Sequence, residues 1–129
     1  MLHTNPSHLY HLPIYKKALE ILFLSRRISK VLRYDLSKLK QDGSEDQDIY
    51  VTGDIVQQSE SLAPEILKAE LSETEKERHV ETLDWLSRRL YKSCMKLELS
   101  NSHGRDYVPI LRKELKNFRK LQRSWMLTL

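Results

Sequence analysis

Apolar residues recur at intervals of three, four or seven along most of this chain, and this spacing constrains the fold more than any other feature. Such intervals place apolar side chains on one face of an α-helix. Glycine and proline are scarce, with 3 and 4 copies in 129 residues. A β-sandwich or a glycine-rich nucleotide-binding fold needs many more turn residues. The sequence therefore predicts an all-α domain.

The apolar intervals, together with residues that start or stop helices, divide the chain into four helices. Pro13 suits a first helical position, and Ser72 with Glu75 fits a capping box. The predicted helices cover about 13–40, 48–71, 73–100 and 107–127, after an N-terminal tail over 1–12. Short connections favour antiparallel neighbours, so we expect an up-down-up-down four-helix bundle over 13–129.

Proline and glycine residues mark the interruptions. An Asp-Gly-Ser turn at 42–44 should end the first helix, and a turn at 101–104 should end the third. Pro64 lies inside the second helix and lacks a backbone N–H, which predicts a kink near Glu60. Gly53 weakens the first turns of the same helix, so its start is less sharply defined.

Charge is strongly segregated, although the formal net charge is only +4. Residues 1–40 carry 8 basic and 2 acidic residues, 41–104 carry 7 and 14, and 105–129 carry 7 and 2. In the predicted bundle the first and fourth helices lie side by side. We therefore expect their basic side chains to pool on one surface.

The last predicted helix carries the densest group of cations. Four of them, at intervals of four, three and four, share one face and are flanked by two lysines. They are Arg112, Lys116, Arg119 and Arg123, with Lys113 and Lys120 beside them. The first helix adds Lys16, Lys17, Arg26, Arg27, Lys30 and Arg33, and the third adds Arg88, Arg89, Lys92 and Lys96. Such a surface would hold phosphates with little sequence selectivity, and a solvated face that keeps the protein soluble is the alternative.

The sequence contains no arrangement that supports catalysis, a metal or a cofactor. The single cysteine, Cys94, excludes an internal disulfide and a Cys-based zinc site, and its spacing predicts a core position. No His-Glu-x-x-His or Glu-x-x-His pair occurs, and the contact of His79 with Glu75 should be an exposed one. The acidic run Asp42, Glu45, Asp46 and Asp48 lacks the spacing of a calcium loop and predicts a solvated connector. We therefore expect a protein that is not an enzyme.

Hydropathy and the distribution of aromatic residues indicate where the protein acts and whether it self-associates. No stretch approaches about 18 uninterrupted apolar residues, and no signal peptide is visible, so we expect a cytoplasmic protein without a membrane partner. Trp85 and Tyr91 fall off the main apolar seam, and the segment around Trp125 is apolar. This surplus predicts either self-association or a hydrophobic plug at the end of the bundle.

Two segments resemble a known family. Residues 11–20 (HLPIYKKALE) resemble the start of the Avd proteins, the accessory variability determinants of diversity-generating retroelements, and residues 119–125 (RKLQRSW) resemble their basic last helix. The resemblance covers nearly the whole chain in the order and length of the helices. A sibling family is the four-helix bundle encoded by intervening sequences of 23S ribosomal RNA genes, to whose second helix residues 61–66 (SLAPEI) are partly similar.

The resemblance implies a homopentameric ring with a positive surface. Such a protein binds the reverse transcriptase of the retroelement and its template RNA or DNA, and supports mutagenic reverse transcription without being an enzyme. The residues expected to contact phosphates or acidic protein groups are first Arg112, Lys116, Arg119 and Arg123, then Arg26, Arg27, Lys30 and Arg33. A structural or protein-docking bundle of the intervening-sequence type, with no nucleic-acid role, is the alternative.

Overall fold

The computed structural model describes residues 6–36, 43, 48–99 and 106–129, and every regular element in this part of the chain is helical. The all-α prediction is thereby confirmed for the described residues. The elements are the 3₁₀-helix η1 (Pro6–His11) and the α-helices α1 (Pro13–Leu36), α2 (Asp48–Glu60), α3 (Leu62–Leu71), α4 (Lys76–Glu98) and α5 (Val108–Met126). Gly43 has a φ of 84°, which glycine adopts without strain. The rest of the turn predicted at 42–44, the turn predicted at 101–104 and the acidic residues 42, 45 and 46 lie outside the described residues.

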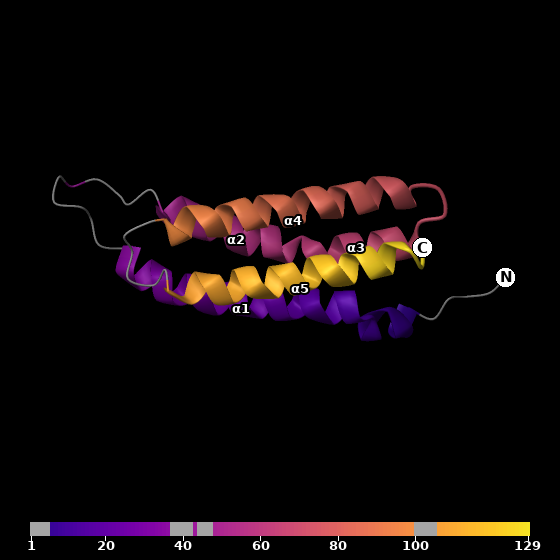
Figure 1. Ribbon diagram of the computed structural model, residues 1–129, viewed down its shortest axis with the longest axis horizontal. Coiled ribbons are helices and arrows are strands. Elements are labelled where there is room, and N and C mark those ends of the chain that lie inside the picture. The colour runs from indigo at the N-terminus through magenta and orange to yellow at the C-terminus, as the bar shows by residue number, and fades with distance from the viewer. Residues whose placement is uncertain (1–5, 37–42, 44–47, 100–105) are drawn as a thin grey trace.

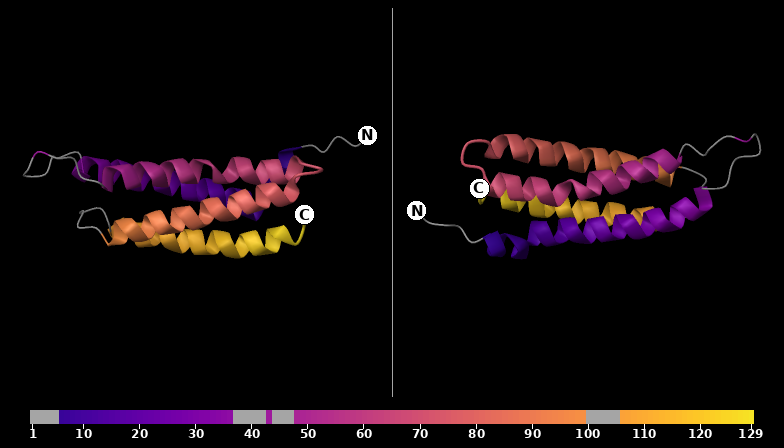
Figure 2. Two further views of the ribbon diagram at one scale, coloured as in Figure 1. Left: turned by 90° about the horizontal axis from the view of Figure 1, so that it is seen from above. Right: turned by 180° about the vertical axis from the view of Figure 1, so that it is seen from behind.

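The helices lie side by side along the long axis of the molecule (Figure 1). α1 packs against α2 and α5, and α4 packs against α2, α3 and α5. α3 follows α2 end to end, as the additional views show (Figure 2). α5, which carries the predicted cationic face, packs mainly against α1 and α4.

The kink predicted from Pro64 is confirmed, and it is a complete break between two helices. α2 ends at Glu60, Ser61 forms a turn, and α3 begins at Leu62. Pro64 has no N–H to donate to the carbonyl of Glu60, so the hydrogen-bond ladder is interrupted there. At the same point, Ser61 donates its N–H to the carbonyl of Gln58, three residues earlier, at 3.3 Å, as in a tight turn.

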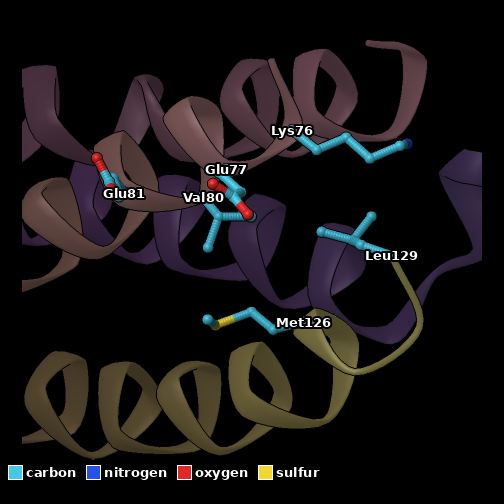
Figure 3. Close-up of a pocket in the computed structure, with 6 residues that line it drawn as sticks. All are labelled: Lys76, Glu77, Val80, Glu81, Met126 and Leu129. Carbon is cyan, nitrogen blue, oxygen red and sulfur yellow. The ribbon is translucent and has the colours of Figure 1, made fainter. Parts of the chain in front are cut away.

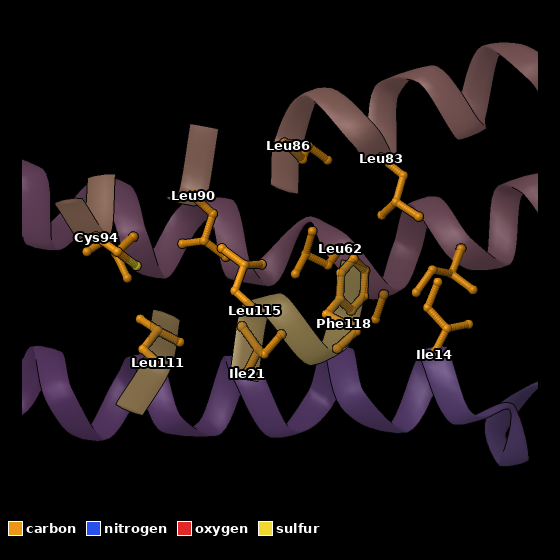
Figure 4. Packing of buried hydrophobic residues seen from close by; sticks show 14 of the residues in the cluster. Ile14, Ile21, Leu62, Leu83, Leu86, Leu90, Cys94, Leu111, Leu115 and Phe118 are labelled. Atoms are coloured by element: carbon orange, nitrogen blue, oxygen red, sulfur yellow. The ribbon is translucent and has the colours of Figure 1, made fainter. Parts of the chain in front are cut away.

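The inward faces of the helices bury one continuous apolar cluster (Figure 4). Ile21 of α1, Leu62 of α3, Leu90 of α4 and Phe118 of α5 belong to it and are inaccessible to solvent. Burying a Leu, Ile or Phe side chain stabilises the folded state by about 1.5–3 kcal/mol relative to leaving it exposed. This cluster, predicted from the apolar spacing, fixes which side of each helix remains outside.

Part of the segment expected to be an N-terminal tail packs on α1. Residues Pro6–His11 form η1, and the side chain of Leu9 in it is only 2% exposed. The ring of Tyr10 meets that of Tyr15 edge-on, with centroids 5.4 Å apart. Leu9 supplies an apolar anchor just before Pro13, and this anchor explains why the described part of the segment is helical.

Half of the predicted capping box is present before α4. The backbone N–H of Glu75 donates to Oγ of Ser72 at 2.8 Å. The reciprocal bond is replaced, because the N–H of Ser72 donates to the carbonyl of Lys68 at 3.0 Å. As a result α4 begins at Lys76, three residues later than the sequence predicts.

Candidate nucleic-acid interface

One flank of α5 is cationic and faces outward. An α-helix turns by about 100° per residue, so cations at intervals of four, three and four lie close together around its axis. Leu111, Leu115 and Phe118 form the buried side, which is centred about 100° from these cations around the helix axis. Four cations of the outer flank are exposed and form no ion pair within the described part of the chain: Lys113, Lys116, Lys120 and Arg123.

The two inner cations of α5 are bound to α4. Nε of Arg112 donates to the carboxylate of Glu98 at 3.0 Å. A hydrogen bond with Tyr91 and the ion pair with Glu98 raise the pKa of the Arg112 guanidinium above its ordinary value. Nη2 of Arg119 lies 3.9 Å from Oδ1 of Asp84. These contacts hold α5 against α4 and orient the outer cations toward solvent.

Of the basic residues that the sequence singles out on α4, one lies beside the cations of α5, and the others lie on the solvent side of α4. Arg88 pairs with Asp84 at 2.9 Å, and therefore shares a carboxylate with Arg119 of α5. The guanidinium of Arg89 lies over the ring of Trp85, 4.9 Å from the ring centroid. Lys92 and Lys96 are also exposed, on the solvent side of α4. We call the following set the α4–α5 basic face: Arg88, Arg112, Lys113, Lys116, Arg119, Lys120 and Arg123.

The cations of α1 point to two different neighbours. Nζ of Lys17 bonds to Glu114 of α5 at 2.8 Å, which raises the pKa of Lys17, and also to Glu20 at 2.7 Å. Nη2 of Arg26 lies 3.4 Å from Oε1 of Glu60 on α2. The other predicted contacts on α1 are exposed: Lys16, Arg27, Lys30 and Arg33.

Lys17 and Arg27 of α1 lie beside α5, whereas Arg26 lies beside α2, and the pooling of the cations of the first and last helices on one surface stays a prediction. Residues 112 and 114 are about 200° apart around the axis of α5. Because Arg112 faces Glu98 of α4, the side of α5 that faces α1 presents Glu114 to Lys17. The contact of Arg112 with α4 and the contact of Lys17 with Glu114 therefore lie on different sides of α5.

The aromatic residues outside the predicted seam behave differently from one another. Trp125 is 5% exposed, and its Nε1 donates to Oε1 of Glu70 on α3 at 2.7 Å, so it is a plug that joins α5 to α3. Tyr91 packs against the core cluster. Trp85 remains exposed beneath Arg89. A shallow pocket lies between α4 and the end of α5. Its lining includes Val80 of α4 and Met126 of α5, and it has both apolar and charged side chains (Figure 3).

Large apolar side chains on α1 and α5 are exposed, and the sequence reasoning missed them. Phe23 is 58% exposed and Ile110 is 52% exposed. Ile110 lines a pocket with Val31 of α1 and Tyr107. Their positions off the inner seams of their helices are the signal that could have identified them.

The histidine, cysteine and carboxylate side chains that could act in catalysis or metal binding were also located in the structure. Among the described residues, no three His, Cys, Asp or Glu side chains gather as metal ligands. His79 is 20% exposed, and its Nδ1 lies 3.0 Å from Glu65 of α3, closer than the exposed partner Glu75 that the sequence suggests. Cys94 is fully buried, as predicted, and burial raises its pKa to about 12.

Comparisons with known proteins add no assignment. No family model, no curated protein and no solved structure matches this chain. Within the described ranges, none of the helices combines the length and the apolar character needed to cross a bilayer. A functional proposal must therefore start from the charged surfaces described above.

Proposed function

We propose that this chain is a non-catalytic, cytoplasmic accessory protein that binds nucleic acid through the α4–α5 basic face. In this proposal it acts with the reverse transcriptase of a diversity-generating retroelement, binds its template RNA or DNA with little sequence selectivity, and supports mutagenic reverse transcription. The observation that carries the proposal is the set of four cations on α5 that are exposed and form no ion pair with any described residue. Phosphates along a nucleic-acid strand would neutralise them and release condensed counterions.

The proposal includes an antiparallel up-down-up-down four-helix bundle in which α2 and α3 together form the second helix. Its support is the packing pattern: α1 contacts α2 and α5, and α4 contacts α2, α3 and α5. Consecutive helices are thus neighbours, and the first helix also packs against the last. Such a bundle keeps the cationic flank of α5 outside while Leu111 and Leu115 stay in the core.

We further propose that the protein assembles into a homopentamer, as the resemblance to the Avd family implies. Exposed apolar side chains such as Phe23, Val31 and Ile110 support self-association. Light scattering on the purified chain, whose mass is 15.3 kDa, should report about five copies per particle. A monomer at micromolar concentration would contradict this part of the proposal.

The binding surface can be tested with two triple variants that change the net charge equally. Lys113→Gln, Lys116→Gln and Lys120→Gln remove three outer cations of α5 and leave the contacts of Arg112 and Arg119 with α4 intact. The control carries Lys68→Gln, Arg78→Gln and Lys96→Gln, which lie outside the α4–α5 basic face.

Fluorescence anisotropy with a structured RNA at moderate salt measures both variants. The α5 variant should lose about tenfold or more in affinity, because it lacks three cations that contact phosphates in any RNA sequence. The affinity of the control should stay within about twofold of the parent. Equal losses in both variants would show that overall charge is sufficient, and would remove the α4–α5 basic face as the site.

A second function is supported by a different observation. Five of the candidate cations already contact carboxylates of the same chain: Lys17, Arg26, Arg88, Arg112 and Arg119. This internal pairing favours a structural or protein-docking bundle without a nucleic-acid role. Absence of RNA and DNA binding by the unmodified protein at low salt would support this alternative and contradict the first proposal.

A further inference from the structure

The groove between α1 and α2 contains a small, strongly basic pocket of about 330 Å³. Its lining residues are Arg26, Ser29, Lys30 and Arg33 of α1 and Val56 of α2. The α1 residues are separated by three, one and three positions, so they occupy one flank of the helix. The pocket lies on the α2 side of α1, away from α5 and from the α4–α5 basic face.

Ser29 is the unusual member of this pocket. The residue is only 3% exposed, and its Oγ has no hydrogen-bond partner among the described residues. One turn earlier, the hydroxyl of Ser25 lies 2.7 Å from that of Ser59 on α2, so the same interface does satisfy a serine elsewhere. A buried hydroxyl without a partner is costly, and native proteins usually provide an acceptor. An acceptor that binds in the pocket would satisfy it after a rotation of the side chain.

The charge balance of the pocket favours an anion. Among the described residues, Glu60 of α2 is the carboxylate that reaches it, at 3.4 Å from Nη2 of Arg26, and both of these side chains are about half exposed. Lys30 and Arg33 form no ion pair within the described ranges. Two of the three positive charges are thus left without a counter-charge from the described residues.

We propose that this pocket binds a phosphate group. Arginine guanidinium groups bind phosphate oxygens through paired N–H donors, and lysine adds a compact point charge. Arg26, Lys30 and Arg33 would supply the charge, and the hydroxyl of Ser29 would donate the remaining hydrogen bond. The phosphate could belong to bound nucleic acid, in which case this inference rests on the proposed function. Free inorganic phosphate is the other source of the same chemistry.

Two variants test the pocket without disturbing the contact of Arg26 with Glu60. Ser29→Ala removes the hydroxyl and almost no volume, and a melting temperature equal to or above that of the unmodified protein would show that it folds. Lys30→Gln with Arg33→Gln removes the two cations of the pocket that form no ion pair with a described residue. The matched control is Lys68→Gln with Lys96→Gln, which lie outside the pocket.

The first probe is inorganic phosphate, followed by the amide NMR signals of residues 26–33. We expect saturable shifts in the unmodified protein and in the control, a response weakened roughly threefold or more in Ser29→Ala, and none in the double variant. Shifts that are absent from the unmodified protein, or unchanged in the double variant, would overturn the phosphate pocket. An unchanged response in Ser29→Ala would overturn the role of the hydroxyl.

The second probe is the structured RNA used for the α4–α5 basic face. If nucleic acid supplies the phosphate, the double variant should bind this RNA roughly fivefold more weakly, and the control should not. Phosphate shifts with unchanged RNA affinity would support the pocket as a site for free phosphate and overturn the nucleic-acid source. RNA binding that is lost only in the α5 triple variant, without any phosphate shifts, would overturn the pocket and leave the proposed function standing. RNA binding that is lost only in the pocket variants would support the pocket and would overturn the α4–α5 basic face as the binding site.

Discussion

Gly53 lies within α2, where glycine is normally unfavourable. A Cβ added at this position would meet nothing within 4 Å. Replacing it with alanine reduces the conformational freedom of the unfolded chain and adds no clash, so Gly53→Ala should increase the free energy of unfolding by about 0.5–1 kcal/mol. Urea denaturation followed by circular dichroism measures the change. Gly43→Ala is the contrasting variant, because its φ of 84° strains any residue with a Cβ. A Gly53→Ala protein less stable than the parent would contradict this account of α2.

Cys94 lies in the core on α4, and its thiol should be unreactive in the folded protein. Burial raises its pKa from 9.0 to about 12, so the nucleophilic thiolate is scarce at pH 8. The unfolded thiol loses its proton near pH 9, and stability should therefore decrease as the pH rises from about 9 toward 12. Labelling with a thiol reagent should proceed only as fast as the protein unfolds. Rapid labelling of the native protein at pH 8 would contradict a core position.

At the scale of one element, Ser72 ends α3 and stabilises the turn that leads into α4. Its Oγ accepts the N–H of Glu75 at 2.8 Å and satisfies one of the free donors at the start of the helix. Ser72→Ala should reduce the free energy of unfolding by about 1 kcal/mol, because this hydrogen bond is lost, and Ser72→Asp should retain most of the stability, because a carboxylate oxygen can also accept the N–H of Glu75. Thermal and urea unfolding measure both variants. Equal stability of the alanine variant and the parent would show that this hydrogen bond contributes nothing.

The interiors of the elements could be predicted from the sequence better than their ends. Ile21, Leu90 and Phe118 repeat at helical intervals with their neighbours, and the structure buries all three. The later start of α4 could not be predicted, because it depends on whether the N–H of Ser72 donates backward to the carbonyl of Lys68 or forward to the side chain of Glu75. Both acceptors are compatible with the same residues.

At the scale of the whole molecule, the sequence predicted the stripe on α5 but not its orientation. The spacing of residues on one helix gives their angular separation, and it says nothing about the rotation of that helix against its neighbours. That rotation is fixed by contacts between distant residues, such as Arg112 with Glu98 and Lys17 with Glu114. The pocket around Ser29 escaped the sequence for the same reason, since its wall includes Val56 of α2.

The salt dependence of RNA affinity tests most directly whether the outer cations of α5 bind phosphates. Between about 50 and 200 mM salt, the logarithm of the association constant should decrease linearly with the logarithm of salt concentration. Lys113→Gln, Lys116→Gln and Lys120→Gln together should reduce this slope by up to about 3, and the control with Lys68, Arg78 and Lys96 replaced should keep the slope of the parent. An affinity that ignores salt, or one slope shared by all three proteins, would contradict the account.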